Sequence, residues 1–192
     1  MTNLLISKPF RFFIFIVVLI VLLTSIVTMR ESNARSPLHM TMAPEFTHTK
    51  HDEWINTAPL TLASLRGKVV LIEFWTYGCW NCYRSFPWLN DLEAKYLQQS
   101  VIVIGVHTPE FEHEKRRDNV IAKVKEFKLQ HPVMLDNDFS YWRAMKNRYW
   151  PSYYLVDKQG RIRGTYVGET HADSRQARAI EQQIQVLLKE ES

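Results

Sequence analysis

Cysteine is scarce in this chain of 192 residues, which contains only Cys79 and Cys82, three positions apart. A protein that relies on structural disulfides usually has more cysteines at wider spacing, so a disulfide-rich scaffold is excluded. Structural zinc is also excluded, because zinc takes about four ligands and the sequence has no second CxxC and no HxxxH pair. His107 and His113 are too loosely placed to complete such a ligand set.

Excess charge of one sign is lacking as well. The formal net charge is +4, but the residues before Pro37 carry +3 of it, which leaves +1 for the rest of the chain. Binding to a nucleic-acid backbone needs lysine and arginine clustered on one face, so no nucleic-acid partner is expected. The run EHEKRRD, residues 112–118, mixes both signs and predicts a solvent-exposed helix face rather than a binding patch.

Long hydrophobic runs are absent except near the N-terminus, where residues 12–27 carry no charge and follow Lys8 and Arg11. A helix rises about 1.5 Å per residue, so this run, extended to residue 29, just reaches the length of a bilayer span. Basic residues ahead of the run predict that the N-terminus stays in the cytoplasm and that the rest is exported. We therefore expect residues 1–29 to be a signal anchor, a single transmembrane helix, with the domain on the extracytoplasmic (periplasmic) side of the cell membrane.

A cleaved signal peptide is the alternative, because Ser32 and Ala34 form a small-x-small pair that a peptidase accepts. Against cleavage, the apolar run is longer than the usual core of a signal peptide, and Arg30 and Glu31 come before the pair. Both interpretations place the domain outside the cytoplasm.

Residues 30–53 show little apolar periodicity and contain Pro37 and Pro44, which predicts a linker. The segment also holds side chains that suit copper, namely His39, Met40, Met42, His48 and His51. A copper carrier therefore stays open as an alternative function, while the main interpretation is a polar linker and a protein without a metal site.

Residues 54–192 alternate strands with helices and form the predicted domain. Residues 69–75 (VVLIEFW) and 101–106 (VIVIGV) are nearly continuous apolar runs, which are typical of strands buried on both faces. The other predicted elements are helices over 80–98, 112–128 and 177–187, a short strand over 132–135, and a hairpin of 153–156 with 162–167. This alternation indicates an α/β fold with a parallel or mixed sheet.

The two cysteines lie in the segment Cys79-Trp80-Asn81-Cys82, which follows a predicted strand and opens a predicted helix. Unpaired backbone N–H groups and the macrodipole at a helix N-terminus stabilise a thiolate, and the pKa of such CxxC thiols is lowered to roughly 3.5–7. Cys79 receives most of this effect. We expect Cys82, almost one turn further along, to be more buried and to attack the mixed disulfide that Cys79 forms.

Four motifs, in the same order, resemble the thioredoxin-like domain of TlpA- and DipZ-type thiol–disulfide oxidoreductases. They are FWTYGCWNC (74–82), GVHTPEF (105–111), DNDFSYWRA (136–144) and RYWPSYYLVDKQG (148–160). The resemblance covers about residues 54–168 and implies a thioredoxin fold, a central mixed sheet flanked by helices, with an N-terminal β-hairpin and an inserted helix–strand unit. It also implies an enzyme whose redox group is the Cys79–Cys82 disulfide, with no other cofactor.

The resemblance implies roles for three further positions. Trp150-Pro151 matches the family's cis-proline, which faces the CxxC in a loop that pairs with an incoming peptide. Glu73 matches a buried acid that takes the proton from the resolving thiol, and burial is expected to raise its pKa. Pro87 matches the kink after the second cysteine.

The sequence departs from the family at Gly78, which stands where a bulkier residue is common. It also has Trp80-Asn81 in place of the thioredoxin Gly-Pro, so the redox potential is left open.

Several of these residues also have a purely structural interpretation. Glu73 then pairs with a lysine, and Trp80 and Trp150 then pack instead of forming an apolar rim for substrates. His107 is expected to be a hydrogen-bonding loop residue. Arg84 is either solvated or a support for the Cys79 thiolate.

The sequence thus predicts a monomeric, membrane-anchored oxidoreductase that exchanges disulfides with exported proteins. The resemblance favours a reductase. After each reaction, a membrane electron-donor protein must reduce the oxidised cysteine pair again. A thiol peroxidase is a second hypothesis, because Thr76-x-x-Cys79 is similar to the peroxiredoxin TxxC, although that motif carries a proline where Ile72 stands.

We expect the full chain to be recovered with the membrane fraction, because the basic residues and the apolar run before residue 30 form an anchor. Cell fractionation, with N-terminal sequencing of the mature protein, measures this. A soluble mature protein that begins near Arg35 would contradict the anchor.

Overall fold

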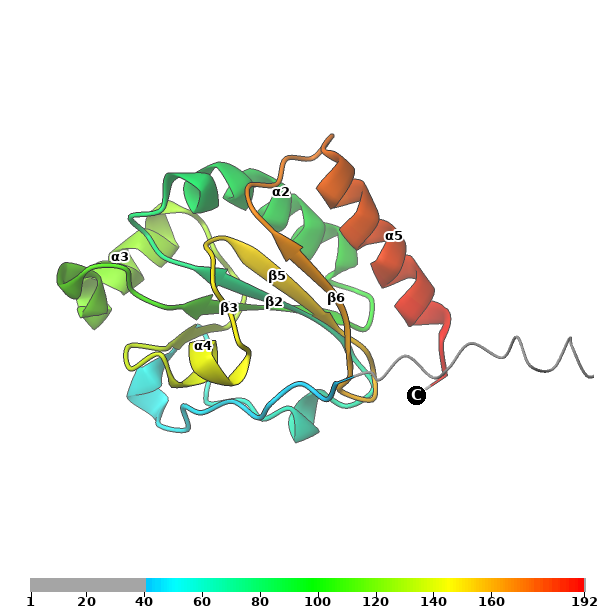
Figure 1. Cartoon of the computed structure of the whole chain (residues 1–192), viewed down its shortest axis with the longest axis horizontal. Coiled ribbons are helices and arrows are strands. Elements are labelled where there is room, and N and C mark those ends of the chain that lie inside the picture. The colour runs from blue at the N-terminus through cyan, green and yellow to red at the C-terminus, as the bar shows by residue number, and fades with distance from the viewer. Residues whose placement is uncertain (1–40, 192) are drawn as a thin grey trace, which may run out of the picture. The chain divides into compact units, whose positions relative to one another are not determined.

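Six strands build one mixed sheet within residues 41–191, the part of the chain that the computed structural model describes (Figure 1). They are β1 Trp54–Ile55, β2 Val69–Trp75, β3 Val101–His107, β4 Val133–Leu135, β5 Ser152–Val156 and β6 Ile162–Val167. The strand order is β1-β4-β3-β2-β5-β6. β3 pairs in parallel with both β2 and β4, and the other neighbours are antiparallel.

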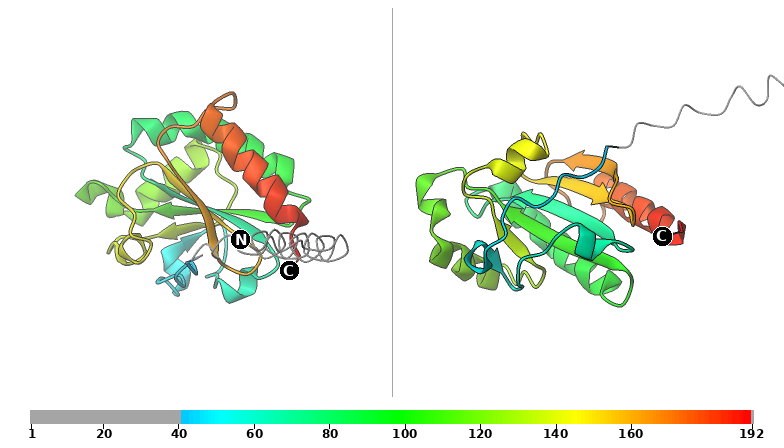
Figure 2. Two further views of the ribbon diagram at one scale, coloured as in Figure 1. Left: turned by 45° about the vertical axis from the view of Figure 1, so that its right-hand side comes forward. Right: turned by 90° about the horizontal axis from the view of Figure 1, so that it is seen from below.

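Helices cover both faces of this sheet, as Figures 1 and 2 show. The helices are α2 Trp80–Tyr96, α3 Arg117–Glu126, α4 Ser140–Ala144 and α5 Arg175–Lys189, with 3-10 turns η1 His51–Glu53, η2 Ala63–Leu65 and η3 Glu112–Lys115. One apolar cluster joins the sheet to α2, α3 and α5, and a second joins the opposite face to α4 and the N-terminal segment. The sheet is therefore the middle layer of three.

Strand β2 lies near the centre of the sheet, and all seven of its residues are buried. Because successive side chains of a strand point to opposite faces, Leu71, Glu73 and Trp75 share the face that packs on α2. Ile72 and Phe74 point to the other face, toward α4. The near-continuous apolar run therefore reflects burial on both faces, as the sequence predicts.

The inserted helix–strand unit implied by the resemblance is present, since α3 and β4 lie between β3 and α4. The expected N-terminal β-hairpin is not found among residues 41–68. The strand ahead of β2 in this segment is β1, and it pairs antiparallel with the distant β4 (Trp54 opposite Met134).

The predicted linker, residues 30–53, overlaps the folded domain. Backbone hydrogen bonds of 2.9 Å join Ala43 N to Gly160 O and Ile162 N to Thr41 O. Phe46 is buried, with its ring 5.2 Å from that of Tyr141. This segment is irregular and is held by isolated apolar side chains. Its sequence therefore lacks the periodicity of a helix or a strand and looks like that of a linker.

The helix expected over 112–128 is interrupted, because η3 ends at Lys115 and α3 begins at Arg117. The solvent-exposed face expected for residues 112–118 is wrong at one position, since Glu114 is completely buried.

The predicted transmembrane helix, residues 1–29, lies outside the described residues. Within residues 41–191, no helix is both long enough and apolar enough to cross a membrane.

Candidate active site

The two cysteines lie where β2 passes into α2 and are joined by a disulfide, with their Cα atoms 5.3 Å apart. Cys79 is the N-cap of α2, and Cys82 N donates a hydrogen bond of 3.2 Å to Cys79 Sγ. Cys79 is half-buried, whereas Cys82 is completely buried. The helix N-terminus therefore offers an N–H group to the first sulfur, and Cys79 is the more exposed residue of the pair.

The Trp150-Pro151 bond is cis, as the resemblance implies. β5 runs antiparallel to β2, and its first residue, Ser152, is opposite Phe74. The start of β5 is thus beside the end of β2, which brings the proline loop to the same end of the sheet as the CxxC. Trp150 is half-buried and packs on Trp142, with ring centroids 4.3 Å apart.

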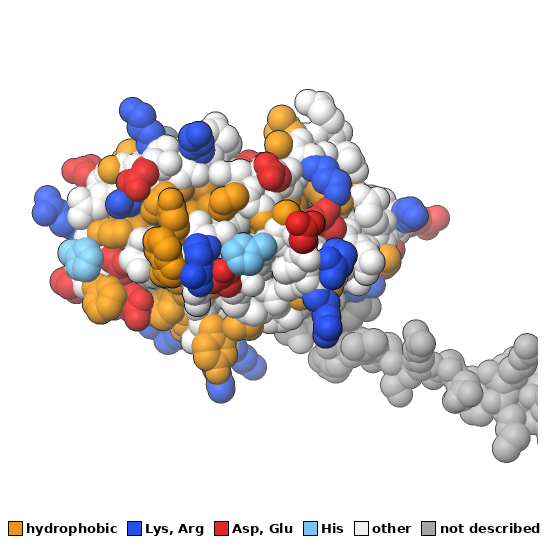
Figure 3. Space-filling view, turned by 90° about the horizontal axis from the view of Figure 1, so that it is seen from above, with side chains coloured by type: hydrophobic (Ala, Val, Ile, Leu, Met, Phe, Trp, Pro, Cys, Tyr) orange, Lys and Arg blue, Asp and Glu red, His pale blue; other side chains and the backbone are white. Residues whose placement is uncertain are grey.

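Trp80 does not pack in the core, because 63% of it is exposed. Its ring stacks on Tyr83 at 5.2 Å between centroids, and the Arg84 guanidinium lies 5.6 Å from it. Figure 3 shows hydrophobic side chains gathered on this side of the molecule with basic and histidine side chains among them. A groove of about 700 Å³ is lined by Tyr83, Arg84, Phe86, Pro87, Asn90, Asp91, Glu126, Phe127, Lys128 and His171.

Glu73 is completely buried on the α2 side of β2. Neither carboxylate oxygen has a hydrogen-bond partner in the described part of the chain, and no ion pair reaches it there, so a lysine partner is not found. Burial raises the pKa of Glu73 well above its ordinary value of 4.5. Tyr153 is its neighbour across the sheet, and the phenol oxygen of Tyr153 likewise has no partner.

Arg84 is not simply solvated. It donates a hydrogen bond of 2.9 Å to Asn81 Oδ1, within the CxxC segment, and forms an ion pair with Glu169. Glu169 also contacts His171. These contacts tie the exposed side of α2 to the segment that follows β6.

His107 is the last residue of β3 and is buried, so it is a strand residue rather than a loop residue. Its Nε2 lies 3.4 Å from Thr76 Oγ1, and its ring is 4.8 Å from Trp75 and 5.7 Å from Tyr77. Burial lowers the pKa of His107 to about 4, so the ring is neutral at ordinary pH.

Glu114, which the sequence analysis did not single out, lies beneath the turn that precedes Cys79. Its Oε1 accepts a hydrogen bond of 2.8 Å from Gly78 N, and its Oε2 accepts from Glu110 N at 2.6 Å and Phe111 N at 3.0 Å. An acid three residues after the N-cap Phe111 is half of a capping-box pattern, the one sequence signal that could have found it.

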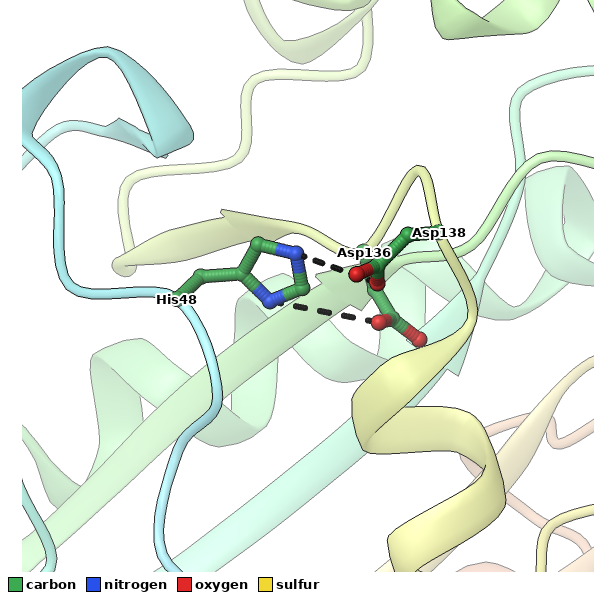
Figure 4. A group of neighbouring side chains, drawn as sticks. All are labelled: His48, Asp136 and Asp138. Carbon is green, nitrogen blue, oxygen red and sulfur yellow. Dashed lines mark ion pairs between the residues drawn. The ribbon is translucent and has the colours of Figure 1, made fainter.

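The side chains that suit copper do not gather at one place among residues 41–191. Met42 forms a bridge with Arg161, whereas His48 lies between Asp136 and Asp138 (Figure 4). His48 Nδ1 is 3.9 Å from Asp136 Oδ1, and Nε2 is 3.4 Å from Asp138 Oδ1. One ligand atom of each of the three residues lies within 4.8 Å of the other two, and the cluster joins the N-terminal segment to the loop between β4 and α4.

Asp136 already has protein partners for its carboxylate. It accepts hydrogen bonds from Tyr141 N and Trp142 N at 2.9 Å and from Thr108 Oγ1 at 3.1 Å. Of the other members of the copper hypothesis, His51 is exposed at the start of η1, and His39 and Met40 lie outside the described residues.

A mixed sheet with a CxxC at the start of its first long helix, facing a cis-proline, defines a thioredoxin-like protein. The redoxin family model matches residues 40–184, and the chain belongs to that family. Within it, the domain is of the thiol–disulfide oxidoreductase type found in TlpA and DipZ.

Two relatives illustrate this assignment. The chain is 44% identical to protein DipZ of Mycobacterium bovis over 119 residues, which cover 60% of this chain but only 17% of DipZ. It is 32% identical to the thiol-disulfide oxidoreductase YkuV of Bacillus subtilis over 126 residues, or 65% of this chain and 82% of YkuV.

Solved structures agree on the fold. A thioredoxin-like superfamily protein matches with a TM-score of 0.69 and 30% identity, over 80% of this chain and 99% of the other. A thiol-disulfide isomerase from Corynebacterium glutamicum matches with a TM-score of 0.63 and 26% identity, over 78% and 98%.

Replacing Glu73 with Gln is expected to stabilise the protein at about pH 8 and to change little near pH 4.5. Well below its ordinary pKa of 4.5, the carboxyl group is protonated in folded and unfolded chains alike, and at that pKa only half of the unfolded chains are ionised. As the pH rises toward the raised pKa of the folded state, ionisation favours the unfolded chain, so the wild type loses stability that the variant keeps. Urea unfolding across this range measures the difference.

The exposed Glu112, replaced by Gln, is the matched control and should show no such pH-dependent gain. A Glu73→Gln protein that unfolds more easily at every pH would show that Glu73 has a structural partner instead.

Proposed function

We propose that this protein is a membrane-anchored, extracytoplasmic oxidoreductase that reduces disulfides of exported proteins through Cys79 and Cys82. The observation that carries the proposal is the asymmetry of the pair. Cys79 is accessible and receives the Cys82 N–H, while Cys82 is buried behind it. One sulfur is therefore placed to meet a substrate and the other to resolve the product.

The reaction has two exchanges. The Cys79 thiolate attacks one sulfur of a substrate disulfide, and the other substrate sulfur leaves as a thiolate and takes up a proton. The Cys82 thiol then gives its proton to Glu73, attacks Cys79 Sγ and releases the second substrate thiol. Two electrons pass to the substrate, and the Cys79–Cys82 disulfide remains, so the redox group is the protein's own.

Glu73 suits this role because it lies on the α2 side of the sheet, where Cys82 packs. A pKa raised toward the working range lets one carboxyl group both accept and return a proton. The cis-proline loop offers a surface beside the CxxC for an extended substrate, with Trp80 and Trp150 as an apolar rim.

After each turnover the disulfide must be reduced again, and we assign this to a membrane electron-donor protein. The apolar run before residue 30 supports the membrane location. The enzyme acts as a monomer in this proposal, since both sulfurs, the acid and the proline loop come from one chain.

A thiol peroxidase is not favoured. The peroxiredoxin pattern needs a proline where the buried Ile72 stands, and the Thr76 hydroxyl already lies at His107 Nε2. A copper carrier is not favoured either, because the backbone of Met42 is fixed at Arg161 whereas the His48 ring lies at Asp136 and Asp138.

Replacing Cys82 with Ala in cells should trap mixed disulfides between Cys79 and exported proteins, because the buried thiol that releases them is gone. Non-reducing gels and mass spectrometry identify the partners. Cys79→Ala is the matched control and should trap none. Trapping through Cys82, or trapping only of cytoplasmic proteins, would overturn the proposal.

Replacing Glu73 with Gln should slow release of the reduced substrate by roughly 10²–10⁴-fold, the usual loss when a general acid–base group is removed. Formation of the mixed disulfide should stay near the wild-type rate, which rapid-quench kinetics on the full chain resolves. Release at the wild-type rate would remove Glu73 from the mechanism.

A further inference from the structure

The carboxylate of Glu114 is buried against the turn that leads into the CxxC. Its oxygens accept three backbone N–H groups, those of Gly78, Glu110 and Phe111, at 2.6–3.0 Å. Gly78 is 36 positions away in the chain, so one carboxylate joins the loop after β3 to the turn after β2.

This carboxylate is an anion without a cation. No ion pair involving Glu114 occurs in the described part of the chain. Burial alone would raise its pKa, but hydrogen bonds from Phe111, Thr76, Glu110 and Gly78 outweigh burial and lower it. The anion is therefore held by backbone N–H donors, an arrangement that depends on their positions.

One of these donors, Gly78 N, belongs to the turn of residues 76–79 that positions the sulfur of Cys79. Cys79 N donates to Thr76 O at 3.2 Å and closes the turn, and Gly78 lies inside it. Cys79 Sγ then meets Cys82 N at 3.2 Å. A turn that shifts moves this sulfur off the helix N-terminus, where the thiolate is stabilised.

Glu114 also explains why position 78 is a glycine. A Cβ atom on Gly78 would lie closer to Glu114 Oε1 than 3.0 Å, a separation that real Cβ atoms essentially never show. Gly78 does not have a positive φ, so its backbone would accept alanine. The obstacle is the carboxylate, and moving it aside breaks its bonds to Glu110 and Phe111.

We propose that Glu114 is a positioning residue for the Cys79 thiolate, and that Gly78 is small because the Glu114 carboxylate occupies the space of its side chain. Glu114 holds the 76–79 turn so that Cys79 Sγ stays at the N-terminus of α2. The proposal rests on the proposed role of Cys79 as the attacking thiol.

Three roles for Glu114 predict different changes in the pKa of the Cys79 thiol when Glu114 is replaced. A positioning residue, once removed, lets the turn relax and raises the pKa of the Cys79 thiol. A nearby negative charge with no positioning role would, once removed, lower that pKa. A group that only stabilises the fold would change the unfolding midpoint and leave the thiol pKa unchanged. The ring of His107, which lies beside this turn at Thr76, is kept neutral by burial, which lowers its pKa.

The test measures the rate of Cys79 alkylation by iodoacetamide across pH in the reduced full chain. Replacing Glu114 with Gln or with Ala is expected to slow alkylation at pH values below the thiol pKa by about 10-fold, the effect of one lost charge-assisted hydrogen bond. The redox potential against glutathione should become more reducing in parallel, since a less stable thiolate favours the disulfide. Faster alkylation, or an unchanged profile with a lower unfolding midpoint, would overturn the proposal.

A double-mutant cycle tests the contact with Gly78. Gly78→Ala alone should slow alkylation as Glu114→Ala does, and the double variant should be no slower than Glu114→Ala, because the clash is gone. Additive effects would overturn the pairing. If the Ala variants do not fold, Glu114→Gln, which keeps the side-chain volume, decides the question alone.

Glu112 provides the matched control, because it lies on the same 3-10 turn, is exposed and pairs with Lys115. Glu112→Gln should leave the alkylation profile unchanged. Alkylation of the wild-type chain separates the two hypotheses. If Cys82 is alkylated faster than Cys79 in the wild type, the proposed function is refuted. If Cys79 is alkylated faster in the wild type but the Glu114 variants behave as the wild type does, only the positioning role is refuted.

Discussion

The burial of β2 on both faces is the constraint on which the rest of the structure depends. A strand with helices on both sides must be almost entirely apolar, as β2 is apart from Glu73, and it must end where the helix layer begins. The chain then turns within four residues, 76–79, and enters α2, so the helix N-terminus and Cys79 come together at the edge of the core. The antiparallel pairing of β5 with β2 adds the cis-proline loop at the same edge.

Two buried carboxyl groups lie near this edge, and their pKa values are shifted in opposite directions. Glu73 has no hydrogen-bond donor within the described residues, so burial raises its pKa. Glu114 has three backbone donors, which outweigh burial and lower its pKa. The same type of side chain thus has a raised pKa in one place and a lowered pKa in the other, and the supply of N–H donors is what separates them.

Much of this arrangement was predictable because it is local. The run 69–75 has the composition of a strand buried on both faces, and the CxxC opens a helix with a clear apolar spacing, so the place of Cys79 at a helix start follows. The packing of the irregular segment 41–53 was not predictable. It depends on contacts of Phe46 and His48 with residues about ninety positions away, and the segment has no hydrophobic periodicity that would indicate them.

The sequence by itself determined the α/β alternation, the reactive pair and the acid in the strand beneath it, since each depends on neighbours within a few positions. Only the tertiary structure decided that Glu73 has no partner and that Glu114, in a run with the pattern of a solvated surface, is buried against Gly78. The physical reason is that the ionisation of a carboxylate depends on the donors around it, and these come from segments that folding alone brings together.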